Sequence, residues 1–217
     1  MITRWLDYLS SASILFPLVA AGIYFRRLSM ELKVFSIFLF FAAVVEIITD
    51  VMSFYKLNNL WVMNIYALLE GIVFIWLIAR WYESKKMFGV AMALALLYLV
   101  YWCITVFVVD GIMVFDSQEL SVKAIILIFL SGYLLILLGI KEEVNLTSNY
   151  RFWISSGILV YFLLSLVVFS SADILLDDKH SAMHFTWSIH SIINIIANLL
   201  YFYGFLCYQK TNSYSSL

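Results

Sequence analysis

The sequence predicts an all-α integral membrane protein, built as a bundle of seven transmembrane helices. Of the 217 residues, 65% are hydrophobic and only 12% are charged, whereas soluble domains carry roughly 25% charged residues. A soluble protein of this size would need more polar side chains to cover its surface. The charges are also spaced so that long apolar segments lie between them. Residues 1–217 are therefore expected to form a single transmembrane domain.

Each span is placed between charged residues, because a helix that crosses ~30 Å of hydrocarbon needs about 20 apolar residues. The bounding pairs of the first six spans are, in chain order, Asp7 and Arg26, Lys33 and Lys56, Lys56 and Arg80, Lys86 and Asp110, Lys123 and Lys141, and Arg151 and Asp173. The seventh span runs from Met183 to about Tyr208. The predicted spans cover residues 8–25, 34–55, 59–79, 87–109, 122–140, 152–172 and 183–208. Pro17, the only proline, interrupts the first span, where a bundle tolerates a kink.

The orientation follows from the loop Lys and Arg residues, because the side that is richer in them faces the cytoplasm. One side holds nine: Arg26, Arg27, Lys33, Arg80, Lys85, Lys86, Lys141, Arg151 and Lys210. The other side holds four: Arg4, Lys56, Lys123 and Lys179. Most loop acids, Glu119 among them, fall on the side with four. This bias predicts an external N-terminus and a cytoplasmic C-terminus in the plasma (inner) membrane.

Several function classes are disfavoured by composition and motif content. A net charge of −1 provides no field that would attract nucleic acid. The chain has eight glycines and contains no phosphate-binding loop, CxxC pair or nucleophile elbow. No cofactor is therefore expected. The two cysteines, Cys103 and Cys207, fall at different membrane depths and are expected to be small packed side chains.

Polar residues at membrane depth are the most informative feature of the sequence, because each charged group there costs at least ~2.5–3.5 kcal/mol. The second, third and seventh spans carry them: Glu46, Asp50, Asn64, Glu70, His184, His190 and Asn194. With a rise of ~1.5 Å per residue, Glu46 and His190 are expected at nearly the same height, and Glu70 slightly deeper. Three different spans thus place polar groups at similar levels.

Helical spacing supports a shared site. Tyr66 and Glu70 are four residues apart, so the phenol can hydrogen-bond the carboxyl group. Trp187, His190 and Asn194 fall within one narrow stripe of the last span. We expect Glu46, Glu70 and His190 to form one coupled polar cluster in the outer half of the bundle. The expected ligand-binding residues are Glu46, Tyr66, Glu70, Trp187, His190 and Asn194, with Asp50, Asn64 and His184 as further candidates.

Three interpretations of this cluster stay open. Buried Glu, His and Asn side chains can simply tie helices together, at ~0.6–2 kcal/mol per interhelical bond. They can instead line a water-filled pocket that opens to the outside, or form a metal or catalytic centre. No bound metal is expected, because the chain has no histidine before His180, which leaves mainly carboxylates as partners for the last span.

Two seven-helix families resemble this chain in part. An external N-terminus and seven spans resemble the rhodopsins, but microbial rhodopsins need a lysine in the middle of the last helix, and none is available here. The His180–His184 pair resembles the His-x-x-x-His motif of the alkaline ceramidase and adiponectin-receptor hydrolases. Those enzymes also use a histidine in an early helix, which this chain lacks.

The expected function is receptor-like: binding or sensing of a small or lipid-like ligand in an outward-facing pocket. With no soluble output domain, a signal would pass to a partner membrane or cytoplasmic protein. One alternative is a membrane-embedded hydrolase with an acid–histidine or metal centre. A second alternative is a proton-coupled transporter in which Glu70 titrates near the middle of the membrane.

Overall fold

The computed structural model describes residues 2–114, 116–141, 146–176 and 180–214. Side chains are described for residues 5–114, 116–140, 146–168 and 188–209. The α-helices are α1 (Ile2–Ser13), α2 (Leu15–Tyr24), α3 (Met30–Phe54), α4 (Leu60–Trp81), α5 (Lys85–Ile104), α6 (Ser117–Lys141), α7 (Tyr150–Leu176) and α8 (His180–Tyr214). Three short turns of other helix types join them: η1 (Phe25–Arg27), η2 (Thr105–Val109) and η3 (Leu146–Ser148).

Seven helical stretches in the described part of the chain are long and apolar enough to cross a membrane. The first combines α1, α2 and η1, and the fourth continues from α5 through η2. The described residues thus confirm an all-α bundle with seven helices that are long and apolar enough to cross a membrane. Many large apolar side chains on the outside of the bundle are exposed, including Ile37, Phe40, Ile47, Leu97, Phe129 and Val167. Such a surface suits contact with lipid rather than with water.

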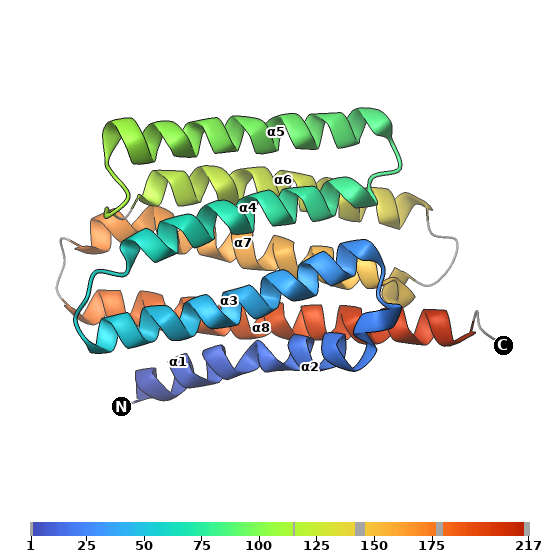
Figure 1. Cartoon of the computed structure of the whole chain (residues 1–217), viewed down its shortest axis with the longest axis horizontal. Coiled ribbons are helices and arrows are strands. Elements are labelled where there is room, and N and C mark those ends of the chain that lie inside the picture. Colours follow the sequence, from blue (N-terminus) through green and yellow to red (C-terminus); the bar gives the residue numbers. More distant parts are fainter. Residues whose placement is uncertain (1, 115, 142–145, 177–179, 215–217) are drawn as a thin grey trace.

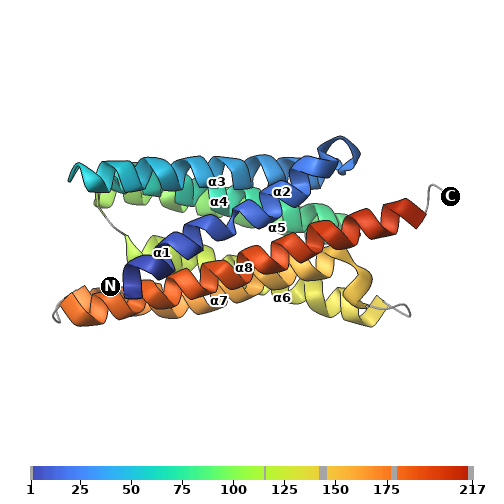
Figure 2. The same cartoon turned by 90° about the horizontal axis from the view of Figure 1, so that it is seen from below.

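The first span bends because of Pro17. Proline has no backbone N–H, so the carbonyl of Ser13, four residues earlier, loses its helical partner. The regular helix stops at Ser13 and resumes at Leu15. As a result, α1 packs along α8, whereas α2 contacts both α8 and α3. Figure 2 shows the N-terminal part of this span diverging from α3 while α2 approaches it.

The remaining helices form two layers in Figure 2, with α3, α4 and α5 on one side and α6, α7 and α8 on the other. An aromatic cluster fills the space between the layers. Phe35 stacks on Phe205 at 5.9 Å between ring centroids and meets Tyr201 edge-on at 5.1 Å. Phe74 contacts Phe35 and Phe162, both edge-on at 5.8 Å. Such pairs stabilise a core beyond the area that they bury.

Helix α6 begins at Ser117, before the predicted start of the fifth span at residue 122. Asp116 causes the early start, because its Oδ1 accepts hydrogen bonds from the backbone N–H groups of Gln118 (2.9 Å) and Glu119 (3.0 Å). These bonds satisfy two of the backbone N–H groups that have no partner within the helix at its N-terminus. Glu119 and Lys123 consequently lie inside the helix and not in the preceding loop.

Candidate functional site

A cleft of about 950 Å³ lies where α1 diverges from α3. Its lining includes Asp7 near the start of α1 and Tyr55 just after α3, so it lies toward the end of the bundle that holds the N-terminus. Figure 1 shows the N-terminus and the end of α3 at the same end of the bundle. Its lining residues come from α1, from the second half of α3 with Tyr55, and from α8: Asp7, Tyr8, Ser10, Ser11, Glu46, Thr49, Asp50, Val51, Ser53, Phe54, Tyr55, His190, Ser191 and Asn194. The polar cleft therefore lies beside α1, the part of the first span that precedes the bend at Pro17.

Glu46 reaches into this cleft from α3. Its Oε1 accepts a hydrogen bond of 2.7 Å from the hydroxyl of Ser11 on α1. Asp50 lies one turn further along the same helix and is exposed. His190, on α8, is half-buried, and its ring centroid lies 5.7 Å from that of Tyr161 on α7. The cleft thus collects carboxylate, hydroxyl, amide and imidazole groups from three helices.

Helices α1 and α8 are joined by a ladder of side-chain hydrogen bonds. Ser191 donates to Asp7 Oδ1 at 2.8 Å, and Asn194 donates to Ser10 Oγ at 3.0 Å. Asn198 donates to Ser13 Oγ at 2.8 Å. These partners on the first span are not among the residues predicted from the sequence. Their spacing contains the signal, since Asp7, Ser10 and Ser13 recur every three residues on one helical face.

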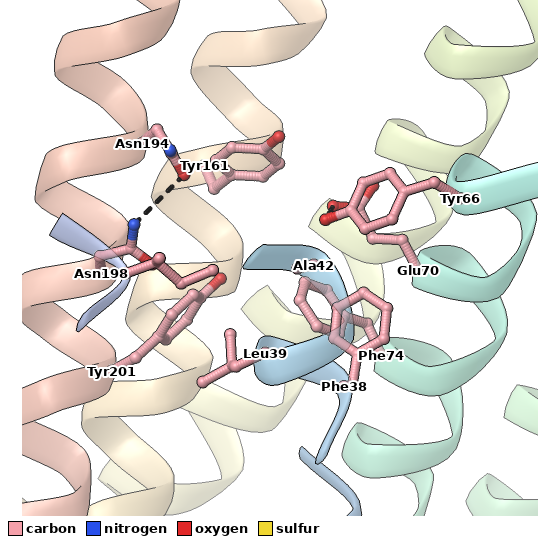
Figure 3. Close-up of a pocket in the computed structure, with 11 residues that line it drawn as sticks. Phe38, Leu39, Ala42, Tyr66, Glu70, Phe74, Tyr161, Asn194, Asn198 and Tyr201 are labelled. Atoms are coloured by element: carbon pink, nitrogen blue, oxygen red, sulfur yellow. Dashed lines mark hydrogen bonds between the residues drawn. The ribbon is translucent and has the colours of Figure 1, made fainter. Parts of the chain in front are cut away.

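A second, much smaller cavity of about 40 Å³ lies deeper in the bundle, beside the cleft. It has room for a water molecule. Figure 3 shows Tyr66 and Glu70 on one side of it and Asn194, Asn198 and Tyr201 on the other. Asn194 lines both the cleft and this cavity. The cleft and the interior carboxylate Glu70 therefore share one polar neighbour.

Glu70 forms an ion pair with Lys123, with 2.7 Å between Oε2 and Nζ. Both side chains are buried, with exposed fractions of 5% and 2%. Tyr66 donates to the other carboxylate oxygen of Glu70 at 3.1 Å. Lys123 also lies 3.4 Å from the carbonyl oxygen of Ala67 and 5.9 Å from the ring centroid of Phe162. A buried charge needs such partners, because it has lost its water.

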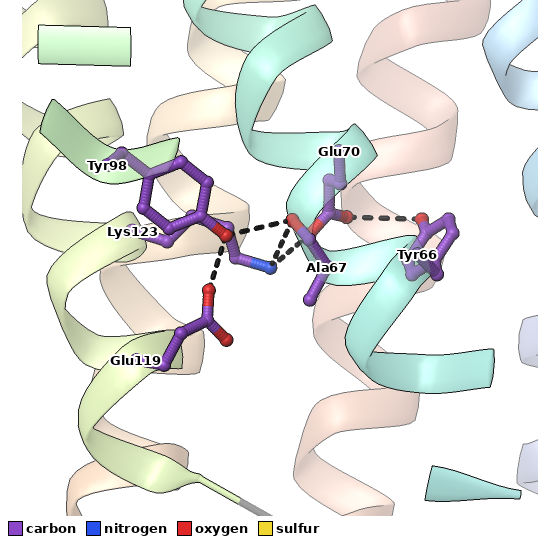
Figure 4. A network of polar contacts seen from close by, with 6 residues as sticks. All are labelled: Tyr66, Ala67, Glu70, Tyr98, Glu119 and Lys123. Atoms are coloured by element: carbon purple, nitrogen blue, oxygen red, sulfur yellow. Dashed lines mark hydrogen bonds and ion pairs between the residues drawn. The ribbon is translucent and has the colours of Figure 1, made fainter. Parts of the chain in front are cut away.

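The network continues to α5 and to the first turn of α6 (Figure 4). The hydroxyl of Tyr98 lies 3.1 Å from the carbonyl oxygen of Ala67 and forms a short hydrogen bond with Glu119. Gly71 makes this arrangement feasible, because a methyl group there would lie only 2.5 Å from Cε1 of Tyr98. Side chains from α4, α5 and α6 thus meet in one buried polar network, which consists of Tyr66, Glu70, Tyr98, Glu119 and Lys123.

This network corrects the sequence-based treatment of Lys123 and Glu119. The sequence predicts both as external loop charges, yet each is only 2% exposed. This prediction is wrong because a charged residue next to an apolar segment does not always mark the end of that segment. Glu70, the partner of Lys123, lies 53 residues away in sequence, so hydropathy alone does not show that Lys123 is paired.

The structure separates the predicted site residues into groups. Glu46, His190 and Asn194 line the cleft together with Asp50, whereas Tyr66 and Glu70 line the smaller cavity. The predicted Tyr66–Glu70 hydrogen bond is present at 3.1 Å.

Of the three remaining candidates, only Asn64 has a described side chain. Asn64 donates to the carbonyl oxygens of Ile112 (2.8 Å) and Val114 (3.0 Å), and so attaches α4 to the loop that follows η2. The side chains of His184 and Trp187 lie outside the described residues.

Among the residues that the structure describes, no group of three or more His, Cys, Asp or Glu side chains is placed to hold a metal ion. No family model matches this chain, and no curated protein or solved structure is significantly similar to it. The fold and the two polar regions therefore define the class of protein: a seven-helix membrane bundle with a polar cleft at one end and a buried charge network beside it.

Proposed function

We propose that this chain binds a small or lipid-like ligand in the cleft between α1, α3 and α8 and passes the signal to a partner protein. The observation that carries this proposal is the cleft itself. Its volume of about 950 Å³ is at the upper end of the range of ~300–1,000 Å³ that is typical of ligand sites. With the N-terminus outside, as the loop charges favour, the cleft opens to the exterior, and a partner would read the signal from the cytoplasmic loops.

The lining favours a ligand with both polar and apolar parts. Asp7, Glu46 and Asp50 supply carboxylates, and His190 and Asn194 supply further hydrogen-bonding groups. Aromatic side chains, Tyr8, Phe54 and Tyr55, line the cleft as well and are largely exposed. Polar groups that orient a ligand against an aromatic and aliphatic wall are the usual composition of small-molecule sites.

Occupancy of the cleft can be tested with one substitution and a matched control. Thr49→Trp would place an indole ring in the cleft and narrow it, because Thr49 lines it, whereas Ile47→Trp would face outward, since Ile47 is 64% exposed. The full-length proteins would be purified in mild detergent and their bound lipids and metabolites identified by native mass spectrometry. We expect a species that binds the wild-type and Ile47→Trp proteins and is lost from Thr49→Trp. Identical bound species in both variants would contradict the proposal.

A hydrolase is the second candidate, because Glu46 and His190 line the same cleft. An acid and an imidazole that face one volume can act as a general acid–base pair. The zinc-dependent form of this candidate has a separate test, which is elemental analysis of the purified protein. We expect no stoichiometric zinc. Zinc that is present and is lost on His184→Ala or His190→Ala would make the hydrolase the preferred function.

A proton-coupled transporter is the third candidate, because Glu70 lies beside a water-sized cavity in the bundle interior. Intramembrane carboxylates of this kind occur in proton relays. Liposomes that contain the protein and a trapped pH-sensitive dye would test this candidate. Proton movement that requires Glu70 would favour transport over ligand sensing.

A further inference from the structure

The buried network contains more acid than base. Glu70, Glu119 and Lys123 are all buried. If all three were ionised, two carboxylates and one ammonium group would leave an uncompensated negative charge inside the bundle. A buried charge without a partner is strongly unfavourable, so the charge balance requires one proton on a carboxyl group. Glu70 already forms the ion pair with Lys123 at 2.7 Å, so Glu119 is the carboxyl group that carries the proton.

The hydrogen bonds of Tyr98 lead independently to the same carboxyl group. The phenol oxygen lies within hydrogen-bond distance of two acceptor oxygens, the carbonyl of Ala67 at 3.1 Å and the carboxyl group of Glu119. A phenol has a single proton to donate. If Glu119 were ionised, one of these two close oxygen pairs would lack a proton between its members. A proton on Glu119 satisfies both contacts.

We propose that Glu119 is a buried proton-binding site. Its carboxyl group is protonated and donates to the hydroxyl oxygen of Tyr98, which in turn donates to the carbonyl oxygen of Ala67. Glu70 and Lys123 remain as the ion pair. The network then carries no net charge, and each of its short polar contacts is a hydrogen bond with a donor and an acceptor.

The surroundings of Glu119 support this assignment. Five charged or titratable groups lie near Glu119. Lys123 is on the same helix, and Asp116 directly precedes that helix. Glu70 is on α4, and Tyr98 and Tyr101 are on α5. Lys123, the one basic group in this set, is held by Glu70. The N-terminus of α6 favours a negative charge. However, Asp116 already caps that terminus, and its carboxylate disfavours a second negative charge on Glu119.

The protonation state of Glu119 would affect how the helices around it pack. Release of that proton would leave a negative charge between α4, α5 and α6 and would remove the donor that joins Glu119 to Tyr98. The hydrogen-bonded network seen in the structure is therefore the form with Glu119 protonated. Proton release is expected to loosen the contact between the first turn of α6 and α5. This site is separate from the cleft, because neither Glu119 nor Tyr98 lines it.

Infrared spectroscopy of the full-length protein in lipid nanodiscs tests the assignment directly. A protonated carboxyl group has a carbonyl stretch that shifts on exchange into deuterated water. We expect this band at neutral pH in the wild type, and a loss of intensity in Glu119→Gln. Glu31→Gln is the matched control, because Glu31 pairs with Arg80 at 3.2 Å on an exposed part of the bundle. Its spectrum should keep the full band. An unchanged band in Glu119→Gln would overturn the proposal.

Thermal unfolding supplies a second readout that does not depend on band assignment. Glutamine can donate to Tyr98 as the protonated acid does, so Glu119→Gln should unfold near the wild-type temperature. Glu70→Gln and Lys123→Met should each unfold at a clearly lower temperature, because each leaves a buried charge alone. If Glu119 were instead an ionised partner of Lys123, its amide variant would be destabilised like Glu70→Gln. That result, or a Glu119→Gln protein that fails to fold, would overturn the proposal.

Discussion

At the scale of single residues, the ion pair between Glu70 and Lys123 is the contact with the largest expected effect. Its partners lie 2.7 Å apart and are almost fully buried. The attraction between them mainly offsets the cost of removing both charges from water, so the pair as a whole contributes little net stability. Removal of one partner is different, because the other charge then remains buried and unpaired.

We therefore expect Glu70→Gln and Lys123→Met each to lower the free energy of unfolding by about 3–5 kcal/mol. The double variant should recover much of this loss, because neither charge is left alone. Chemical denaturation in detergent and a double-mutant cycle would measure the coupling. The exposed pair Glu31–Arg80 at 3.2 Å is the control, and its removal should cost about 0–1 kcal/mol. Additive losses at Glu70 and Lys123 would contradict the pairing.

The residue-level predictions from sequence succeeded where the signal was local. The Tyr66–Glu70 hydrogen bond follows from a spacing of four residues on one helix and is present at 3.1 Å. The prediction for Lys123 was wrong because hydropathy treats a lysine at the edge of an apolar segment as the end of that segment. The i, i+4 pair of Glu119 and Lys123 is visible in the sequence, but only the packing of α4 against α6 identifies Glu70 as the partner of Lys123.

At the scale of helices, a glycine on α4 sets the distance to its neighbours. A methyl group at Gly71 would lie 2.5 Å from Cε1 of Tyr98 and 3.2 Å from Cδ of Lys123. Both are parts of the buried network, so the neighbouring helices would have to move. We expect Gly71→Ala to lower the free energy of unfolding by about 1–3 kcal/mol, as is usual for overpacking.

Gly22→Ala is the matched control for this effect, since nothing lies within 4 Å of a methyl group at that position on α2. There the substitution should be neutral or stabilising by about 0.5–1 kcal/mol, because alanine is the better helix former. Both variants can be compared by denaturant unfolding in the same detergent. Equal effects at the two glycines would mean that Gly71 is not a close-packing position.

The bend at Pro17 is the second feature at this scale. Pro17→Ala restores the missing N–H, so α1 and α2 can form one straighter helix and α1 can approach α3. We expect the cleft to narrow. In a background without Cys103 and Cys207, a cysteine at Thr49 should react more slowly with a water-soluble maleimide once Pro17 is replaced.

The control for this experiment is a cysteine at the exposed residue Gln118, whose labelling should not change. Faster or unchanged labelling at Thr49 would contradict a role of the bend in opening the cleft. The sequence predicted that a kink at Pro17 is tolerated. It could not predict the cleft, because the divergence of α1 from α3 depends on how α1 and α2 pack against α8.

At the scale of the whole molecule, the number of spans was predictable because it depends on composition and length alone. Exposed apolar residues cover the outside of the bundle, and the buried charged groups Glu70, Glu119 and Lys123 have hydrogen-bond or ion-pair partners within it. The orientation in the membrane rests on the loop charges. With Lys123 buried inside α6, nine basic residues on the predicted cytoplasmic side oppose three on the other side. The corrected count strengthens the original bias.

We therefore predict that the N-terminus is external and that the segments 26–33, 80–86 and 141–151 face the cytoplasm. In the cysteine-free background, a cysteine at Glu83 should not react with a membrane-impermeant maleimide in intact cells and should react once the membrane is opened. A cysteine at Asp110, which lies at the opposite end of α5 and η2, should react in intact cells. Both positions are exposed, so a difference between them reports membrane side rather than burial. Labelling of Glu83 from outside, with protection of Asp110, would reverse the orientation and would place the opening of the cleft on the cytoplasmic side.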